Sequence, residues 1–153
     1  MTPSVIYTTV FPALADTDTV RRATALMLEH RVCDLPVVDA AGKLLGMFRL
    51  DRLLAVMLPK AALMDYGMPD LAFAMETVGQ LRERLAEVED HPVREFVVKP
   101  EHVAHPQTSP LEIVLLLYKG ANAIPVVETG GSKLVGMVTP RDLLTALHGG
   151  EGK

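Results

Sequence analysis

The clearest feature of the chain is a pattern of apolar runs that occurs twice, about ninety residues apart. In the first copy the apolar run Leu35–Val38 is followed by turn residues and then by a second run, Leu44–Phe48. In the second copy the run Ile124–Val127 is followed in the same order by Leu134–Val138. Short apolar runs that are rich in β-branched residues and separated by glycine-containing turns indicate β-hairpins. An internal repeat built on two hairpins is therefore the first organising hypothesis.

Amphipathic segments flank each hairpin and predict one helix before it and one after it. Asp18 or Thr19 can cap the first helix, and Ser109 followed by Pro110 opens its counterpart in the second copy. After the hairpins, apolar residues recur on one helical face. These are Leu53, Leu54 and Met57 in the first copy and Leu143, Leu144 and Leu147 in the second. Each copy is thus predicted to be helix–strand–strand–helix, which is too small to close a core without the other copy.

A longer segment separates the two copies. Residues 76–89 carry apolar side chains at helical spacing, whereas the residues before them mix methionine, leucine and proline without a clear period. We expect a surface helix here, within an insert that covers the core or contacts a partner. The predicted organisation is repeat 1 over residues 1–57, a helical insert over 58–92, repeat 2 over 93–149 and a short tail over 150–153.

Composition narrows the classes of protein to which the chain can belong. Of its 153 residues, 49% are hydrophobic and 22% are charged, which suits a packed globular protein. The net charge of −4 lacks the basic surplus of a nucleic-acid binder. No apolar run approaches the roughly 20 residues that span a membrane, and no signal-peptide pattern opens the chain. Because Cys33 is the only cysteine, no intrachain disulfide can form, and we expect a cytoplasmic protein without nucleic-acid or membrane partners.

The segment Gly136–Asp142 carries the strongest candidate chemistry. A strand gives way to a helix near Pro140, which makes Thr139 the natural N-cap of that helix. Two interpretations remain open at this point. In the first, Thr139 and Asp142 only start the helix, and Asp142 favours its dipole. In the second, the carboxylate accepts hydroxyl protons of a ribose beside the threonine hydroxyl, with a phosphate near the helix N-terminus and Arg141.

The repeated pattern resembles tandem CBS domains, which are named for cystathionine beta-synthase and occur in pairs called Bateman modules. The resemblance rests on Leu35–Asp39, on Ile124–Glu128 and above all on Gly136–Asp142. The last segment fits the family's nucleotide motif of Gly, two apolar residues, Thr or Ser, two residues of any kind, and Asp. The resemblance implies an α/β fold with two CBS repeats around a pseudo-twofold axis and a helical insert. It also implies a homodimer formed through the helices near residues 20–29, 53–57 and 111–118.

In CBS domains the residues that match Asp142 and Thr139 hold the ribose, so the resemblance implies these roles here. It also places the base against the start of the second copy's first strand. Arg141 at the helix start can meet phosphate, with an exposed helix arginine as the alternative. The ligand-binding residues expected on this basis are Asp142, Thr139, Arg141, Ala123, Ile124, Pro125 and Thr108. The first copy departs from the motif, because Arg49 replaces the threonine and Arg52 the aspartate. We expect this first site to be empty, or altered so that the arginines meet phosphates; solvated arginines are the alternative.

Together these features favour a non-catalytic regulatory module. It would bind an adenine nucleotide or adenosyl ligand (AMP, ADP, ATP or S-adenosylmethionine) and transmit its ligand state to another protein. Neither a cofactor nor a metal is required, and no P-loop, dinucleotide-binding turn or nucleophile elbow occurs in the sequence. The alternative is a structural dimerisation module without a ligand, which the degraded first motif favours. A metal-dependent enzyme is the least favoured hypothesis, because His102 and His105 fall on an extended segment, where positions i and i+3 point to opposite faces.

Overall fold

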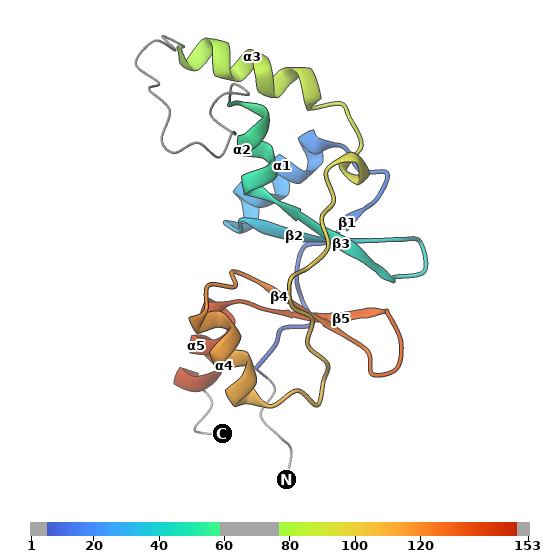
Figure 1. Ribbon diagram of the computed structural model, residues 1–153, viewed down its shortest axis with the longest axis vertical. Helices are drawn as coiled ribbons and strands as arrows, with labels where there is room; N and C mark the ends of the chain where they lie inside the picture. The colour runs from blue at the N-terminus through green and yellow to red at the C-terminus, as the bar shows by residue number, and fades with distance from the viewer. Residues whose placement is uncertain (1–5, 59–76, 150–153) are drawn as a thin grey trace, which may run out of the picture.

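The chain folds into two α/β repeats, each a small sheet with helices on one side. The computed structural model describes residues 6–58 and 77–149. The two sheets lie in the middle of the molecule and the helices lie at its two ends (Figure 1). The N-terminal repeat contains β1 (Leu14–Ala15), α1 (Val20–His30), β2 (Asp34–Val38), β3 (Leu44–Arg49) and α2 (Leu50–Val56). The C-terminal repeat contains α4 (Pro110–Tyr118), β4 (Ile124–Val127), β5 (Leu134–Val138) and α5 (Pro140–Gly149). Between them lie α3 (Val78–Val88) and a short 3-10 helix, η3 (Val93–Glu95). The predicted α/β fold with two repeats is confirmed.

Side-chain caps explain where the helices begin. The Thr19 hydroxyl accepts a hydrogen bond of 3.2 Å from the backbone N–H of Arg22, so Thr19 is the N-cap of α1. Asp18, the other candidate, instead accepts a bond from the N–H of Ala15. The Ser109 hydroxyl accepts a bond of 3.2 Å from the N–H of the second residue of α4, and proline stands at the first helical position. Both predicted helix starts therefore have the expected polar residue at the cap.

The strand pairing has the same pattern in both repeats. In the N-terminal sheet the strand order is β1-β2-β3, with β1 parallel to β2 and β2 antiparallel to β3. In the C-terminal sheet β4 pairs antiparallel with β5. Ala104 forms a parallel bridge with Val126 at the position that β1 occupies in the first repeat. Each sheet is therefore a hairpin with a parallel segment beside its first strand.

The two repeats exchange short segments at the free edges of their hairpins. Thr8, from the start of the chain, pairs with Met137 of β5 through backbone hydrogen bonds of 2.8 and 3.0 Å. Val98, which follows the insert, pairs with Met47 of β3 through bonds of 2.8 and 2.9 Å. The two pairs are equivalent, because a shift of ninety residues relates Thr8 to Val98 and Met47 to Met137. This reciprocity supports the pseudo-twofold relation between the repeats.

The repeated glycine of each hairpin is required by this exchange. A Cβ atom on Gly46 would lie 2.4 Å from Val97 Cγ1 and 2.6 Å from the carbonyl oxygen of Val98. A Cβ atom on Gly136 would lie 2.3 Å from Tyr7 Cδ1. Real Cβ contacts are essentially never shorter than 3.0 Å, so only glycine permits the exchanged segments to approach this closely.

The turns of the two hairpins also meet near the pseudo-twofold axis. The N–H of Leu44 donates to the carbonyl oxygen of Ser132 at 2.8 Å, and the N–H of Leu134 donates to that of Gly42 at 3.0 Å. The same shift of ninety residues relates Leu44 to Leu134 and Gly42 to Ser132, so the two hydrogen bonds are equivalent. They join the repeats at the turn end of the hairpins.

Each repeat has a buried apolar core of its own. In the N-terminal repeat the core includes Val20, Ala23, Leu26 and Met27 of α1, together with residues of all three strands. Phe48 of β3 meets Phe96 edge to face, with ring centroids 6.3 Å apart. In the C-terminal repeat the core is smaller and includes Ile6, Ala104, Ile113, Ile124, Val126 and Val138. Residues 93–98 and 6–8 thus contribute to cores that lie far from them in sequence.

Helix α3 of the insert packs against the helical end of the N-terminal repeat (Figure 1). Helix α3 contacts α2, and its Leu85 and Val88 pack against the N-terminal core. Val78, at the start of the same helix, is 70% exposed. Helix α3 begins with a reciprocal cap, in which Thr77 accepts from the N–H of Gln80 and the Gln80 side chain accepts from the N–H of Thr77. The methionine-rich part of the predicted insert lies outside the described residues.

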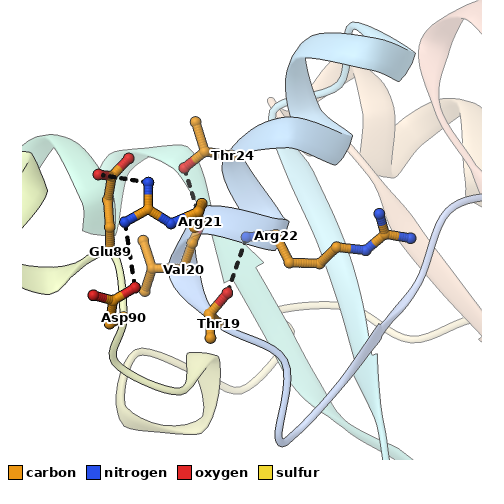
Figure 2. Close-up of polar contacts among 7 residues, drawn as sticks. All are labelled: Thr19, Val20, Arg21, Arg22, Thr24, Glu89 and Asp90. Carbon is orange, nitrogen blue, oxygen red and sulfur yellow. Dashed lines mark hydrogen bonds and ion pairs between the residues drawn. The ribbon is translucent and has the colours of Figure 1, made fainter.

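An arginine connects the end of the insert to α1. Figure 2 shows the guanidinium of Arg21 pointing toward the carboxylates of Glu89 and Asp90. The N···O distances are 3.2 and 3.3 Å. The backbone N–H of Arg21 also donates to the carbonyl oxygen of Glu89 at 2.9 Å. The chain after α3 is therefore held against the first turn of α1 by both backbone and side-chain bonds.

Candidate functional site

The passage from β5 to α5 places a threonine hydroxyl beside a carboxylate. Thr139 lies between the strand and the helix, and Asp142 lies in the first turn of α5. Oδ2 of Asp142 accepts bonds from the Thr139 hydroxyl at 2.9 Å and from the Thr139 backbone N–H at 3.0 Å. The backbone N–H of Asp142 is 3.2 Å from the Thr139 hydroxyl oxygen, to which it donates. The two residues therefore cap the helix, and both remain only half-buried.

This helix start borders a cleft of about 440 Å³. Drug-sized ligands occupy pockets of about 300–1,000 Å³, so the cleft is large enough for a nucleotide. Its walls come from both repeats and from the exchanged N-terminal segment. The lining residues are Thr8, Val10, Phe11 and Pro12; His30 to Asp34 and Pro36; Asn122 and Ala123; and Met137 and Thr139 to Asp142.

Four of the seven residues expected at the second motif line this cleft. They are Ala123, Thr139, Arg141 and Asp142. Ile124 and Pro125 follow Ala123 in β4 and are buried, and neither lines the cleft. Thr108 lines a different cavity of about 580 Å³, between α4 and the inner face of the C-terminal sheet, together with His105 and Gln107. The Thr108 hydroxyl accepts a bond from the backbone N–H of His105.

Sequence reasoning missed the contributions of the N-terminal segment and of the first repeat. Thr8, Val10 and Phe11 reach the cleft because their segment pairs with β5 rather than with its own repeat. The region from His30 to Asp34 reaches it from the end of α1. The available signal was the shift of ninety residues, which aligns Thr8 with Val98, but one sequence does not reveal which edge each segment joins.

The equivalent position in the first repeat is almost filled. Arg49, Asp34 and Met47 line a cavity of only about 40 Å³, which also touches Asn122 and Ala123. The Arg49 guanidinium bonds to Asp51 at 3.0 Å, and its Nε is buried without a hydrogen-bond partner among the described residues. Arg52 is exposed and lines neither this cavity nor the larger cleft. Such a space is close to the size of a single water molecule and excludes a nucleotide in this conformation.

Asp34 stands where these two cavities meet and lines both of them. Burial raises the pKa of its carboxyl above the ordinary value of 3.8, the Arg49 guanidinium opposes this shift, and the Asp51 carboxylate adds to it. The net direction shows that loss of hydration outweighs the attraction of the arginine. The wall between the cavities thus contains a carboxyl group whose ionised form is destabilised by its surroundings.

In residues 6–58 and 77–149, no group of three or more His, Cys, Asp or Glu side chains is arranged to hold a metal ion. Over the same part of the chain, no helix is both long and apolar enough to cross a membrane.

The comparison with protein families identifies both repeats. The CBS domain family matches residues 1–59 and 93–149. The chain belongs to the CBS domain family. Its two matched segments make it a CBS pair, as the resemblance of the two hairpins implied. No curated protein matches the chain.

Solved structures of CBS proteins share this fold over nearly the whole chain. An AcuB protein from Vibrio cholerae, described as a putative acetoin utilization protein, matches with a TM-score of 0.70 and 22% identity, covering 100% of this chain and 98% of that one. CBSX2 from Arabidopsis thaliana, crystallised in complex with AMP, matches with a TM-score of 0.66 and 20% identity, covering 97% and 95%. The CBS domain of a membrane protein from Sphaerobacter thermophilus matches with a TM-score of 0.60 and 26% identity, covering 89% and 81%. Other matched chains are longer, and this chain spans 58% of one and 51% of another.

Proposed function

We propose that this CBS pair is a non-catalytic regulatory module that binds an adenine nucleotide or adenosyl ligand in the cleft beside Asp142. The observation that carries the proposal is the Thr139–Asp142 pair on the wall of a 440 Å³ cleft. Oδ2 of Asp142 is used by the helix cap, while the contacts of the described residues leave Oδ1 free. A carboxylate oxygen and an adjacent hydroxyl suit the two hydroxyl groups of a ribose. CBSX2, which shares the fold at 20% identity, was crystallised with AMP, and this supports the choice of ligand class.

Transmission to another protein would follow from the composition of the cleft. Thr139 and Asp142 belong to the C-terminal repeat, whereas His30 to Asp34 belong to the N-terminal repeat. A ligand that touches both repeats favours the relative pose in which both sets of contacts form. A protein that binds one pose better than the other would then respond to the ligand.

The test is a thermal-shift and calorimetric titration with AMP, ADP, ATP and S-adenosylmethionine. A ligand at one hundred times its Kd stabilises the folded state by about 2.7 kcal/mol, which corresponds to a rise of roughly 5–10 °C in Tm. We expect this rise for the wild type with at least one of the four compounds and not for Asp142→Ala. If Asp142→Ala binds all four compounds as the wild type does, the proposed site is wrong.

Asp142→Ala also weakens the cap of α5, so a matched variant is needed. Thr77→Ala removes one half of the equivalent cap on α3, which lies outside the cleft. We expect Thr77→Ala to lower Tm without ligand and to keep the full ligand-induced rise. Comparison of the two variants separates loss of a cap from loss of a binding group.

An exposed apolar surface on the C-terminal helices supports a second proposal, that the protein is a homodimer. Leu111 and Tyr118 of α4 are 77% and 85% exposed, and Leu144 and Leu147 of α5 are 66% and 62% exposed. Most apolar residues of α1 instead face their own core, with Leu28 the exposed exception, and α3 packs on α2. We therefore assign the dimer contact to α4 and α5. Several large apolar side chains exposed on two neighbouring elements of one repeat are a feature of interaction surfaces.

Light scattering tests the dimer and its location. Leu111→Glu is expected to give a monomer, whereas Leu28→Glu, at a similarly exposed position of α1, is expected to leave a dimer. A dimer that survives Leu111→Glu at micromolar concentration contradicts the assignment. If the protein is a dimer that no adenosine compound stabilises, the structural dimerisation module replaces the ligand-binding function.

A further inference from the structure

One residue on the wall of the cleft has an unfavourable backbone conformation. Arg31, at the C-cap of α1, has φ 56° and ψ 47°, and it is the only residue other than glycine with a positive φ in the described part of the chain. Its counterpart after α4 is Gly120, with φ 111°. Glycine is common at this position because a side chain makes the left-handed region costly. Arginine therefore replaces the residue type that would favour stability.

Arg31 lines the cleft that Asp142 also lines. It is exposed, and none of the described residues forms an ion pair or hydrogen bond with its guanidinium. Its neighbour His30 is instead 3.7 Å from the carboxylate of Glu29. Non-glycine residues held in the left-handed region cluster at functional sites, where the position of the side chain offsets the cost.

A second arginine borders the same space from the other repeat. Arg141 lies next to Asp142 at the start of α5 and also lines the cleft without an ion-pair partner among the described residues. The ribose-binding pair and the two arginines are thus parts of one cleft. Guanidinium groups bind phosphate oxygens through two parallel N–H···O bonds, and they repel a cationic ligand.

We propose that Arg31 is a specificity-determining residue that binds the phosphate of the ligand, so that the cleft selects phosphorylated adenosine over adenosine and S-adenosylmethionine. This inference rests on the proposed function of the cleft. It narrows the ligand to nucleotides with at least one phosphate. It also accounts for an arginine at a position where the second repeat has glycine.

Calorimetry with AMP, adenosine and S-adenosylmethionine tests the proposal on the full chain. We expect the wild type to bind AMP at least about tenfold more tightly than adenosine, because bonds between charged groups are among the stronger ones. Arg31→Gly is expected to bring the affinity for AMP close to that for adenosine and to leave the affinity for adenosine unchanged. Its Tm without ligand is expected to equal or exceed that of the wild type, because glycine adopts this backbone freely.

Arg31→Asn provides a second variant, because asparagine tolerates the left-handed region. Arg22→Ala is the matched control, since it removes an exposed arginine of α1 that does not line the cleft. A wild type that binds AMP and adenosine equally, or an Arg31→Gly variant with unchanged affinity for AMP, overturns the role of Arg31 and leaves the proposed function standing. A wild type that binds none of the three compounds nor any other adenine nucleotide overturns both proposals.

Discussion

Replacement of Gly46 by alanine tests the exchange of segments on which the whole arrangement depends. The new Cβ would lie 2.4 Å from Val97 Cγ1, 2.6 Å from the carbonyl oxygen of Val98 and 3.3 Å from its carbonyl carbon. The valine side chain can rotate, but the backbone oxygen cannot move without shifting the segment. The segment is held to Met47 by two hydrogen bonds of 2.8 and 2.9 Å. Relief of the overlap must therefore stretch or break this pairing.

The expected loss of stability follows from these two contributions. Overpacking of a well-packed site costs about 1–3 kcal/mol. Each strained hydrogen bond of the pair contributes about 1 kcal/mol at most when it is lost. A free energy of unfolding lowered by roughly 3 kcal/mol is the central expectation, which corresponds to a Tm lower by about 6–12 °C for a chain of this size.

Chemical and thermal denaturation of the full chain measure this loss. Gly79→Ala is the control, because a Cβ there meets only the Thr77 hydroxyl at 3.6 Å, and a helical position favours alanine over glycine. We expect Gly79→Ala to have unchanged or slightly higher stability. Wild-type stability in Gly46→Ala would refute the close approach of residues 97–98 to β3.

Three other substitutions report on the cleft wall, a helix cap and the insert. Asp34→Asn should raise Tm at pH 7, because the Asp34 carboxyl has a raised pKa and its ionisation therefore opposes folding. The difference in Tm between Asp34→Asn and the wild type should shrink as the pH falls through the raised pKa toward 3.8, and a pH series of melting curves would show this. Thr19→Ala should lower the free energy of unfolding by about 1 kcal/mol through loss of the α1 cap, and a loss below the error of denaturant titration would contradict that role. Arg21→Gln should cost less than about 1 kcal/mol, because the Arg21 side chain is 59% exposed and, although Glu89 is only 21% exposed, Asp90 is 84% exposed; the difference from wild type should fall further in high salt.

The elements and the two-repeat fold were predictable because they depend on local patterns. Apolar runs of strand length defined the hairpins, and Thr19 and Ser109 marked the two helix starts with short polar side chains. The Thr139–Asp142 pair was identified for the same reason, since both residues lie within one turn of α5. These features require contacts only between near neighbours in sequence, which a single sequence records directly.

The composition of the cleft was less predictable because it depends on contacts between distant segments. The pairing of Thr8 with β5 joins residues more than a hundred positions apart, and no local pattern specifies it. Thr108 was expected beside Asp142 because it lies in the extended entry segment of the second copy, but it lines a separate cavity on the helical side of the sheet. Arg31 gave no signal, because left-handed backbone at a C-cap is inferred from glycine or asparagine and not from arginine.

The pseudo-twofold axis should generate two equal cavities, and their inequality has an identifiable cause. On one side Thr139 and Ala123 present short side chains to the cleft, whereas at the equivalent positions on the other side Arg49 and Asp34 present longer ones. The first space shrinks to about 40 Å³ and the second stays open at about 440 Å³. Because Asp34 also borders the open cleft, a ligand in that cleft would lie beside a residue that lines the small cavity as well. If the proposed function holds, a ligand that contacts Asp34 would link the packing of the two repeats to occupation of the single open cleft.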